Sequence, residues 1–568
     1  MGHDSTAVAA AAVGGSGGGV QVLPPPGAAV AFGLSSFPRP RPQLGLRRIA
    51  NGVGRRGTRT VCAVLLAASF GPPRATRASP RRSVSVIRAT SPPLAAASFP
   101  RSIAMAAPPP APPAAATEPG LRAGTSAFLV VPPADTDARW ASAKEWSLMG
   151  APPLGLMRLL WTHWAKVDLR HRGVAARLRA TVLPSLLNGF LGLVDWVVHG
   201  RAIEATPLCE RPVFVLGLAR SGTTMLHELL AADTDQFVTP DTFQVVHSSS
   251  FLTLRPLRQR LLAGALKPTR PMDNVAQSWD APNEDGFAIS ALSGGVSFYP
   301  VMQFITDSRA FLPHLLTFDT PIGAAAFPRW RDAFLHFCRK VLYAAQRNAP
   351  VVAAGDPPPR ARQLLLKSPP HTARIRILRQ LFPGARFVYI HRHPEGVVQS
   401  TCTLLLRYLP LNALQGYTAA DCEEALLGIT RSVTHAYLRD RSLLSPGELV
   451  EVSYEKLTAD PAGTLRHIYD TLGLHGAPGT AERDRIVALH DRIAVEAMAY
   501  KTDGKLNRHT PLSAEAVARL HAAIPELYEA GGYAPSHGVA TPEAAVAATA
   551  VDGGMPPVGA GGGGNNEA

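Results

Sequence analysis

The chain has few cysteines, few charges and no long apolar run, and each shortage excludes a class of protein. Its 568 residues include five cysteines and no C-x-x-C pair, which excludes a zinc ribbon and a dense disulfide framework. No stretch reaches the ~18–20 uninterrupted apolar residues of a membrane span. With 46% hydrophobic residues, the chain is nevertheless too apolar to be wholly disordered and too long for one small domain.

Lysine is absent from residues 1–122, where only Asp4 and Glu118 are acidic against fourteen arginines. The rest of the chain is nearly neutral, which argues against a nucleic-acid partner. The Ala-, Pro-, Gly- and Ser-rich composition predicts that residues 1–125 are a disordered extension. Arg-rich, acid-poor extensions are typical of transit peptides, and residues 87–89 (Ile-Arg-Ala) resemble a plastid processing site. We therefore expect a plastid protein, with the cytoplasm and the secretory pathway as alternatives.

The remaining chain divides into three segments. Residues 126–206 carry two helical patterns, Trp140–Val167 and Val174–Arg201, which we expect to pack on the body as a helical segment. Residues 207–535 alternate apolar strands with helices, which predicts one domain with an α/β fold of three layers around a central parallel sheet. The expected strands are Val213–Leu216, Leu364–Leu366, Phe387–Ile390 and Leu449–Val452. Residues 536–568 end in GGGGNNEA and are expected to be disordered.

The apolar stretch Thr181–Val198 is interrupted by Pro184, Asn188 and Asp195. These residues favour an amphipathic helix packed on the body over a membrane span. Peripheral contact with a membrane surface is a second interpretation, because the flanks of the stretch are basic. The flanking residues are Arg177, Arg179 and Arg201.

A glycine-rich loop follows the first expected strand. Gly217 and Gly222 have the G-x-x-x-x-G spacing of a phosphate-binding loop, and the amides that follow can hold an anion at a helix N-terminus. Thr223 stands where a Walker loop has lysine, which argues against ATP or GTP hydrolysis. Arg220 supplies positive charge instead. The structural alternative is a serine–threonine N-cap on a core helix.

A second anion site is expected near residue 392. Lys367 ends one expected strand, at the edge of the sheet where ligands bind in open parallel sheets. Pro369 opens a helix expected to run to Phe382. Arg392 ends the next strand and Ser400 lies on the helix after it, so the two can hold one phosphate. A solvated loop around Arg392 is the alternative.

These segments resemble the two phosphate-binding regions of sulfotransferases that use 3′-phosphoadenosine 5′-phosphosulfate (PAPS). The first resembles the family's 5′-phosphosulfate loop, although Ala219 stands where many members have Pro or Trp. Its matching residues are Arg220, Ser221, Gly222, Thr223 and Thr224. In the second, the resemblance implies that Arg392 and Ser400 contact the 3′-phosphate and that Lys367 lies near the sulfuryl group.

The resemblance covers residues 207–535 and implies further contacts with the nucleotide. Tyr454, in a Tyr-Glu-x-Leu pattern, would lie on the adenine side. A late basic loop resembles the one that closes over the nucleotide and contains Lys505, Asn507 and Arg508. The implied activity is transfer of a sulfuryl group from PAPS, without a metal, to a hydroxyl or amine of an acceptor such as a glycan, a lipid or a small metabolite.

An acceptor hydroxyl needs a general base. Glu284, in the stretch Pro-Asn-Glu-Asp, is the first candidate, and the rivals are Asp241, Asp285 and His371. Asp241 has a spacing from the loop similar to that of the catalytic glutamate of tyrosylprotein sulfotransferases. The structural alternative for Glu284 and Asp285 is a charge pair at a helix N-terminus that faces solvent.

Two other functions stay open on the sequence. A P-loop kinase or GTPase would need a lysine at Thr223 and a carboxylate on a strand to hold Mg²⁺. A non-catalytic nucleotide-binding protein would keep the fold without the chemistry.

Overall fold

A computed structural model describes residues 126–129, 150–170, 172–258, 262, 264, 266, 269, 276–349, 362–475, 479–502 and 511–537. The chain divides into two compact units, Met1–Pro110 and Ala111–Ala568, and every described residue belongs to the second. The whole of the expected extension at 1–125 lies outside the described residues. So do residues 140–149, 538–568, Lys505, Asn507 and Arg508.

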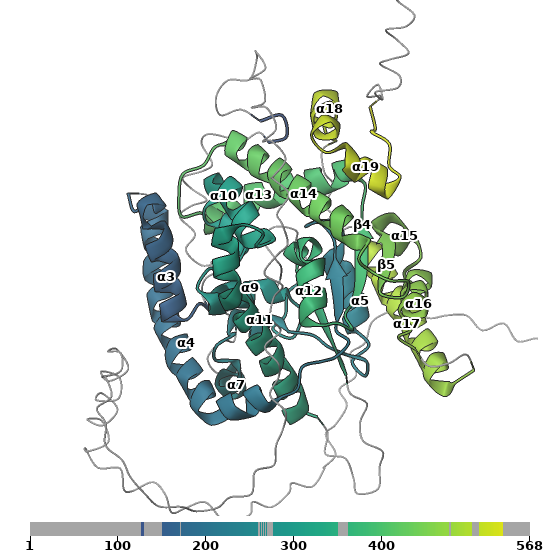
Figure 1. Cartoon of the computed structure of the whole chain (residues 1–568), viewed down its shortest axis with the longest axis horizontal. Coiled ribbons are helices and arrows are strands. Elements are labelled where there is room, and N and C mark those ends of the chain that lie inside the picture. The colour runs from purple at the N-terminus through teal and green to yellow at the C-terminus, as the bar shows by residue number, and fades with distance from the viewer. Residues whose placement is uncertain are drawn as a thin grey trace, which may run out of the picture. The chain divides into compact units, whose positions relative to one another are not determined.

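The second unit contains a five-stranded sheet with helices around it (Figure 1). The strands are β1 (Val213–Leu216), β2 (Phe237–Val238), β3 (Gln363–Lys367), β4 (Arg386–His391) and β5 (Leu449–Ser453). The longer helices are α3 (Pro153–His163), α4 (Arg172–Ala205), α5 (Thr223–Ala231), α9 (Asp285–Ser293), α11 (Pro321–Arg347), α13 (Pro394–Asn412), α14 (Ala419–Arg441), α16 (Pro461–Leu472), α17 (Ala481–Thr502) and α18 (Ala514–Ala523). The shorter ones are α6 (Thr242–Val246), α7 (Phe251–Leu254), α10 (Ser308–Phe311), α12 (Ile375–Leu381), α15 (Tyr454–Ala459), α19 (Pro525–Gly531), η1 (Trp164–Lys166), η2 (Arg255–Leu257), η3 (Tyr299–Met302), η4 (Ile305–Asp307), η5 (Leu312–Leu316) and η6 (Pro369–Ala373).

The sheet is parallel throughout, with strand order β2-β3-β1-β4-β5. β1 lies at the centre, where Val213 pairs with Leu365 of β3 and with Arg386 of β4. Because parallel strands end at the same edge of a sheet, the segments after β1, β3 and β4 meet there. These are the segments that carry the expected loop, Lys367 and Arg392.

Side chains that alternate along the strands fill a core on each face of the sheet. On one face Phe214, Leu366 and Phe387 pack with residues of α9, α11 and α12. On the other face Val215, Leu365 and Val388 pack with residues of α5, α16 and α17. Figure 1 shows α12 and α17 on opposite sides of the strands. Strands covered on both faces read as continuous apolar runs, and the prediction of an α/β fold with a central parallel sheet is confirmed.

The structure departs from the sequence prediction in three places. The four expected strands are present with small changes at their ends, and β2 is an addition. The helix expected over Trp140–Val167 begins, in its described part, at Pro153 and ends at His163. The single helix expected from Pro369 to Phe382 is wrong, because the chain bends at Arg374 between η6 and α12. The Arg374 guanidinium there donates hydrogen bonds to the carbonyls of Leu315 and Leu316.

Helix α4 turns its polar side chains toward the body. Asp195 forms an ion pair of 2.8 Å with Lys340 of α11, and both side chains are 2% exposed. Asp195 also accepts hydrogen bonds from the amides of Leu252 and Thr253 at the start of α7. Arg177, expected on the flank of a surface stretch, is instead buried and donates to two carbonyl oxygens of the segment at the end of α13.

Candidate active site

Three left-handed backbone conformations shape the loop between β1 and α5. Gly217, Arg220 and Gly222 have positive φ angles of 148°, 72° and 102°. Glycine adopts such angles without a steric cost, and it occupies the first and the third of these positions. Gly222 is the N-cap residue of α5, and no side chain caps this helix in the described structure. The serine–threonine N-cap alternative is therefore wrong. The amides of the first turn of α5 lack partners within the helix, as an anion site requires.

Hydrogen bonds connect this loop to β4 and to the segment that follows β3. The Ser221 hydroxyl lies 2.8 Å from the Leu218 carbonyl oxygen and 3.1 Å from that of Ile390 in β4. The Thr372 hydroxyl, in η6 after β3, accepts from the Gly217 amide at 2.8 Å and lies 3.0 Å from its carbonyl oxygen. The Ser221 side chain thus supports the loop from behind.

The second expected anion site lies directly against this loop. Arg220 Nε donates to Ser400 Oγ at 3.0 Å, and Arg392 Nη1 donates to the Arg220 carbonyl oxygen at 3.3 Å. The Arg392 guanidinium lies 4.5 Å from the centre of the Tyr454 ring, as a cation–π pair. The structure therefore brings Arg220, Arg392, Ser400 and Tyr454 together, and Arg392 does not lie in a solvated loop.

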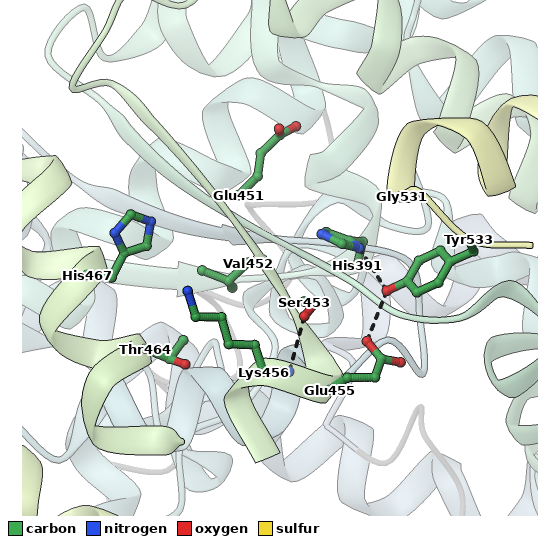
Figure 2. Close-up of a pocket in the computed structure, with 10 residues that line it drawn as sticks. All are labelled: His391, Glu451, Val452, Ser453, Glu455, Lys456, Thr464, His467, Gly531 and Tyr533. Atoms are coloured by element: carbon green, nitrogen blue, oxygen red, sulfur yellow. Dashed lines mark hydrogen bonds between the residues drawn. The ribbon is translucent and has the colours of Figure 1, made fainter. Parts of the chain in front are cut away.

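The segment that contains Tyr533 and Ser536 forms hydrogen bonds with residues on either side of Arg392. It lies next to a cavity of about 310 Å³ (Figure 2). The Tyr533 hydroxyl donates to Glu455 and lies 2.9 Å from His391 Nδ1 at the end of β4. Burial lowers the pKa of His391, which favours its neutral form. Ser536 donates from its amide and its hydroxyl to Glu395 in the first turn of α13. The backbone that carries Arg392 is thus held from both sides.

Lys367 and Glu284 form an ion pair beside the phosphate loop. The distance from Lys367 Nζ to Glu284 Oε1 is 2.7 Å, and Nζ also donates to Thr224 Oγ1 of α5 at 3.3 Å. The Lys367 side chain is 2% exposed and that of Glu284 is 18% exposed. Tyr299 of η3 donates to the second oxygen of Glu284 at 2.5 Å. Burial and the Glu284 carboxylate raise the pKa of Tyr299, so its hydroxyl stays a donor.

The two nearest rivals for the general base are buried behind Glu284. Asp285 Oδ2 lies 2.7 Å from His371 Nε2, and both side chains are fully buried. Ser368 donates to Asp285 Oδ1 and accepts from the Gly286 amide. Although burial raises the pKa of Asp285, the charge of His371 and the hydrogen bonds from His371 and Ser368 lower it overall. The alternative of a solvent-facing charge pair is wrong, since Asp285 faces the core.

Asp241 does not join this group. Its side chain accepts from the Gln244 amide and caps α6, while the Gln244 side chain returns the contact. It also pairs with Arg255. Burial raises the pKa of Asp241, and Arg255 opposes this effect. Asp241 is not among the residues that line the cavity beside Lys367.

That cavity has a volume of about 470 Å³. One end is polar and is formed by Arg220, Thr223, Thr224, Glu284 and Lys367. The remaining wall is mainly apolar and includes Phe287, Phe298, Met302, Ile305, Leu404, Leu405, Leu411 and Ile429. Among the described residues, no three His, Cys, Asp or Glu side chains are grouped as a metal site.

The same residues lie within a match to a known family. Residues 212–478 match the family model described as "Sulfotransferase family". This part of the chain is therefore similar to the sulfotransferase family. The match includes the phosphate loop, Glu284, Lys367, Arg392, Ser400 and Tyr454, and the resemblance stated from the sequence is confirmed.

Relatives with assigned names are also sulfotransferases. An omega-hydroxy-beta-dihydromenaquinone-9 sulfotransferase, Stf3, of Mycobacterium bovis is 28% identical over 342 residues, which cover 59% of this chain and 81% of the relative. Stf3 of Mycobacterium tuberculosis matches to the same extent. A crystal structure of the sulfotransferase STF1 from Mycobacterium tuberculosis has 17% identity and a TM-score of 0.42, over 70% of this chain and 98% of that one.

The sequence analysis did not identify three residues of the site. Tyr299 contacts Glu284, Ser368 contacts Asp285, and Thr372 supports Gly217. Ser368 directly follows Lys367, and that position was a usable signal. Tyr299 and Thr372 belong to short 3₁₀ turns, and nothing local in the sequence distinguishes them.

Proposed function

We propose that this enzyme transfers the sulfuryl group of PAPS to a hydroxyl of an apolar acceptor, with a lipid alcohol as the acceptor class. The observation that supports this most directly is the Glu284–Lys367 pair. It lies in the polar part of a mainly apolar cavity, beside a phosphate loop. An acceptor whose hydroxyl is at one end of a hydrocarbon body matches that distribution of polar and apolar groups.

The nucleotide is assigned to the cluster around Arg220. The uncapped amides at the start of α5, with Arg220, suit the 5′-phosphosulfate. Arg392 and Ser400 suit the 3′-phosphate, and Tyr454 suits the adenine side. The hydrogen bond between Arg220 and Ser400 supports one bound nucleotide that reaches both groups, because the two sites adjoin.

The chemistry needs one base and one cation. A bond forms between the acceptor oxygen and sulfur while the bond between sulfur and the bridging phosphate oxygen breaks. Glu284 takes the acceptor proton. Lys367 and the amides of α5 stabilise the negative charge that grows on the leaving phosphate oxygen. The products are a sulfate ester and 3′-phosphoadenosine 5′-phosphate (PAP).

The names of the mycobacterial relatives support the acceptor class. Each is described as acting on omega-hydroxy-beta-dihydromenaquinone-9, a hydroxylated compound. For this chain we keep only the chemical class, a hydroxyl on an apolar body. A glycan would need polar partners along the cavity wall, and that wall is mainly apolar.

Calorimetric titration with PAP tests the assignment of the donor. We expect clear binding to the wild type and a loss of about 10- to 100-fold in affinity for Arg392→Ala, because the charge-assisted contact is removed. Arg466→Ala, which removes a surface arginine paired with Asp491, is the matched control and should bind normally. Equal binding of ATP would favour a kinase, and absence of PAP binding would contradict the proposal.

A panel of acceptors tests the rest. With labelled PAPS, long-chain alcohols should accept the label better than glucose or phenol. PAP binding without transfer to any acceptor in a lipid extract would favour the non-catalytic alternative.

We also propose that residues 1–125 direct the protein to plastids. A fusion of residues 1–105 to a fluorescent protein should enter plastids, whereas a diffuse cytosolic or a secreted signal would contradict this.

A further inference from the structure

Large apolar side chains are exposed mainly in one region. Fourteen of the eighteen exposed large apolar residues in the described part of the chain lie between Leu154 and Val198. We call them the α3–α4 surface: Leu154, Met157, Trp161, Trp164, Leu169, Val182, Leu183, Leu186, Leu187, Phe190, Leu193, Trp196, Val197 and Val198. Helices α3 and α4 contact each other and run side by side (Figure 1). An apolar area this large marks a binding surface.

The two faces of α4 are reversed relative to an ordinary helix on a protein surface. Its polar residues Ser185, Asn188 and Asp195 point inward and form hydrogen bonds with Ala151, Ser250 and α7. Its outer face carries apolar residues, with Leu183 75% and Val197 69% exposed. A helix normally buries its apolar stripe. In water this apolar face is therefore left exposed, while Ser185, Asn188 and Asp195 on the inner face have hydrogen-bond partners.

Length and apolar composition would allow α4 to cross a membrane. Its inner face argues against crossing. Asp195 and Lys340 are each 2% exposed and are bound to each other, and a spanning position would separate Asp195 from Lys340 and from the amides of α7. A charged group alone in hydrocarbon is costly. Since the outer face alone is apolar, the helix suits a position in the plane of a lipid interface.

We infer that the α3–α4 surface binds to a lipid bilayer interface, with α4 lying parallel to the membrane. Arginines at both ends support a lipid partner. Arg179 lies one turn before Leu183 and Arg201 lies one turn after Val197, so both border the outer face, and both are exposed. Long basic side chains at such borders reach lipid phosphates. Trp161, Trp164 and Trp196 are the residue type enriched at membrane–water interfaces.

Charge favours lipid over a second copy of the chain. Glu204 is the only exposed acid in the described residues of α4. If two copies paired through α4, Arg179 would face an arginine in either orientation, either Arg179 or Arg201 of the second copy. Like charges placed opposite each other weaken an interface, whereas lipid phosphates complement both ends at once.

The surface also lies close to the acceptor cavity. On its inner side α3 buries Leu156 and Leu159 in the same core cluster as Phe298, Val301 and Ile305, and these three residues line the cavity. The helix that faces the bilayer therefore packs into the same apolar core as part of the cavity wall. This inference deepens the proposed function. Only one part of it rests on that function, namely that the acceptor enters the cavity from the bilayer.

Flotation of the full-length chain with neutral phosphatidylcholine vesicles tests the inference, with no donor or acceptor present. The wild type should float. Leu183→Glu/Phe190→Glu/Val197→Glu should lower the partition coefficient at least about tenfold, because three apolar contacts are lost. The matched control is Ile322→Glu/Leu443→Glu/Val495→Glu, which changes three exposed apolar residues elsewhere and should float like the wild type.

A second arm tests the arginines. Phosphatidylglycerol in the vesicles should strengthen binding, and Arg179→Gln/Arg201→Gln should remove part of that gain, about fivefold or more, while binding to neutral vesicles persists. Because residues 1–125 are basic and present in every variant, only differences between variants count.

Three results would overturn the inference. The first is that the wild type does not float, as expected if another segment of the chain covers the surface. The second is that the triple variant floats as well as the wild type. The third is that light scattering shows a dimer for the wild type and a monomer for the triple variant. PAP titration of the wild type, beside its flotation, separates the two proposals. Flotation without PAP binding would retain the lipid surface and reject the proposed donor, and the reverse would retain the donor alone.

Discussion

Two buried lysines in this protein form ion pairs of nearly the same length in different surroundings. Lys340 and Asp195 lie 2.8 Å apart, and Lys367 and Glu284 lie 2.7 Å apart. Around the first pair, two carbonyl oxygens accept from Lys340 and two amides donate to Asp195. Around the second pair the partners are two hydroxyl groups, from Thr224 and Tyr299.

The difference separates a structural pair from a reactive one. Burial lowers the pKa of Lys340, and Asp195 opposes this effect by stabilising the charged form. Backbone groups form hydrogen bonds with both members of the Lys340–Asp195 pair. The pair joins α4 to α7 and α11. The Glu284 carboxylate faces a cavity and is partly exposed. Substitutions in the two pairs should therefore affect different measurements.

The largest expected effect is that of Glu284→Gln on turnover. Removing the base should lower kcat about 10³-fold, while the amide keeps the shape and the contact with Tyr299. PAP affinity and the thermal midpoint should stay close to those of the wild type. Asp195→Asn is the comparison, and the kcat of its folded fraction should be unchanged. A Glu284→Gln enzyme with at least a third of wild-type turnover would assign the base elsewhere.

Lys340→Met should have the largest effect on stability. It leaves Asp195 buried without its cation, and we expect a loss of about 3–5 kcal/mol in the free energy of unfolding by urea titration. Lys367→Met should cost about 2 kcal/mol or less, because Glu284 is partly exposed and keeps Tyr299.

Lys340→Met/Asp195→Asn should recover part of that loss, since no charge is left unpaired and Asn still accepts from the amides of α7. Equal losses for the two lysine variants would remove the distinction between the pairs.

Tyr299→Phe should have a smaller effect on catalysis. The variant loses one hydrogen bond to the carboxylate proposed as the base, and kcat should fall about tenfold with stability nearly unchanged. Tyr343→Phe, which removes a hydroxyl bonded to His199 on the Lys340 side, should leave kcat within about twofold of the wild type. If both variants lose the same activity, Tyr299 has no special part in the reaction.

The last prediction concerns the pH dependence of stability and His227, beside Lys367. Burial lowers the pKa of His227 to about 3, and the charge of Lys367 adds to this. The unfolded chain binds this proton below about pH 6.5 and the folded chain does not, so the free energy of unfolding falls as pH decreases through this window. The contribution is at most about 1.4 kcal/mol per pH unit. His227→Gln should flatten the pH profile of urea unfolding, and exposed His467→Gln should leave it unchanged.

Much of the fold could be predicted because strands covered on both faces have an unbroken apolar sequence, as Phe387–Ile390 does. β2 has only two residues and is a strand because it pairs with β3, so no local pattern announces it. The bend at Arg374 depends on carbonyls of Leu315 and Leu316, about sixty positions earlier in the chain. The polar residues of α4 were visible in the sequence, but the direction in which they point depends on Lys340 and α7.

The candidate site followed a similar rule. Lys367 and Arg392 each follow a strand in a parallel sheet, so their common edge was predictable. Tyr299 reaches Glu284 only after α9 and η3 fold back on each other. For Asp241 the sequence did contain a signal: an Asp followed three residues later by Gln is the pattern of a capping box. That pattern favours a structural role over a catalytic one.

The ring of Tyr454 lies between Gly222 and Arg392, and this arrangement mechanically links the two ends of the proposed nucleotide site. A methyl group on Gly222 would fall 2.4 Å from a carbon of that ring, and its φ of 102° already disfavours any side chain. The ring would have to tilt away, and the guanidinium stacked on it would lose its support. A single added carbon in the first loop would thereby disturb the arginine that we propose binds the phosphate at the other end of the nucleotide.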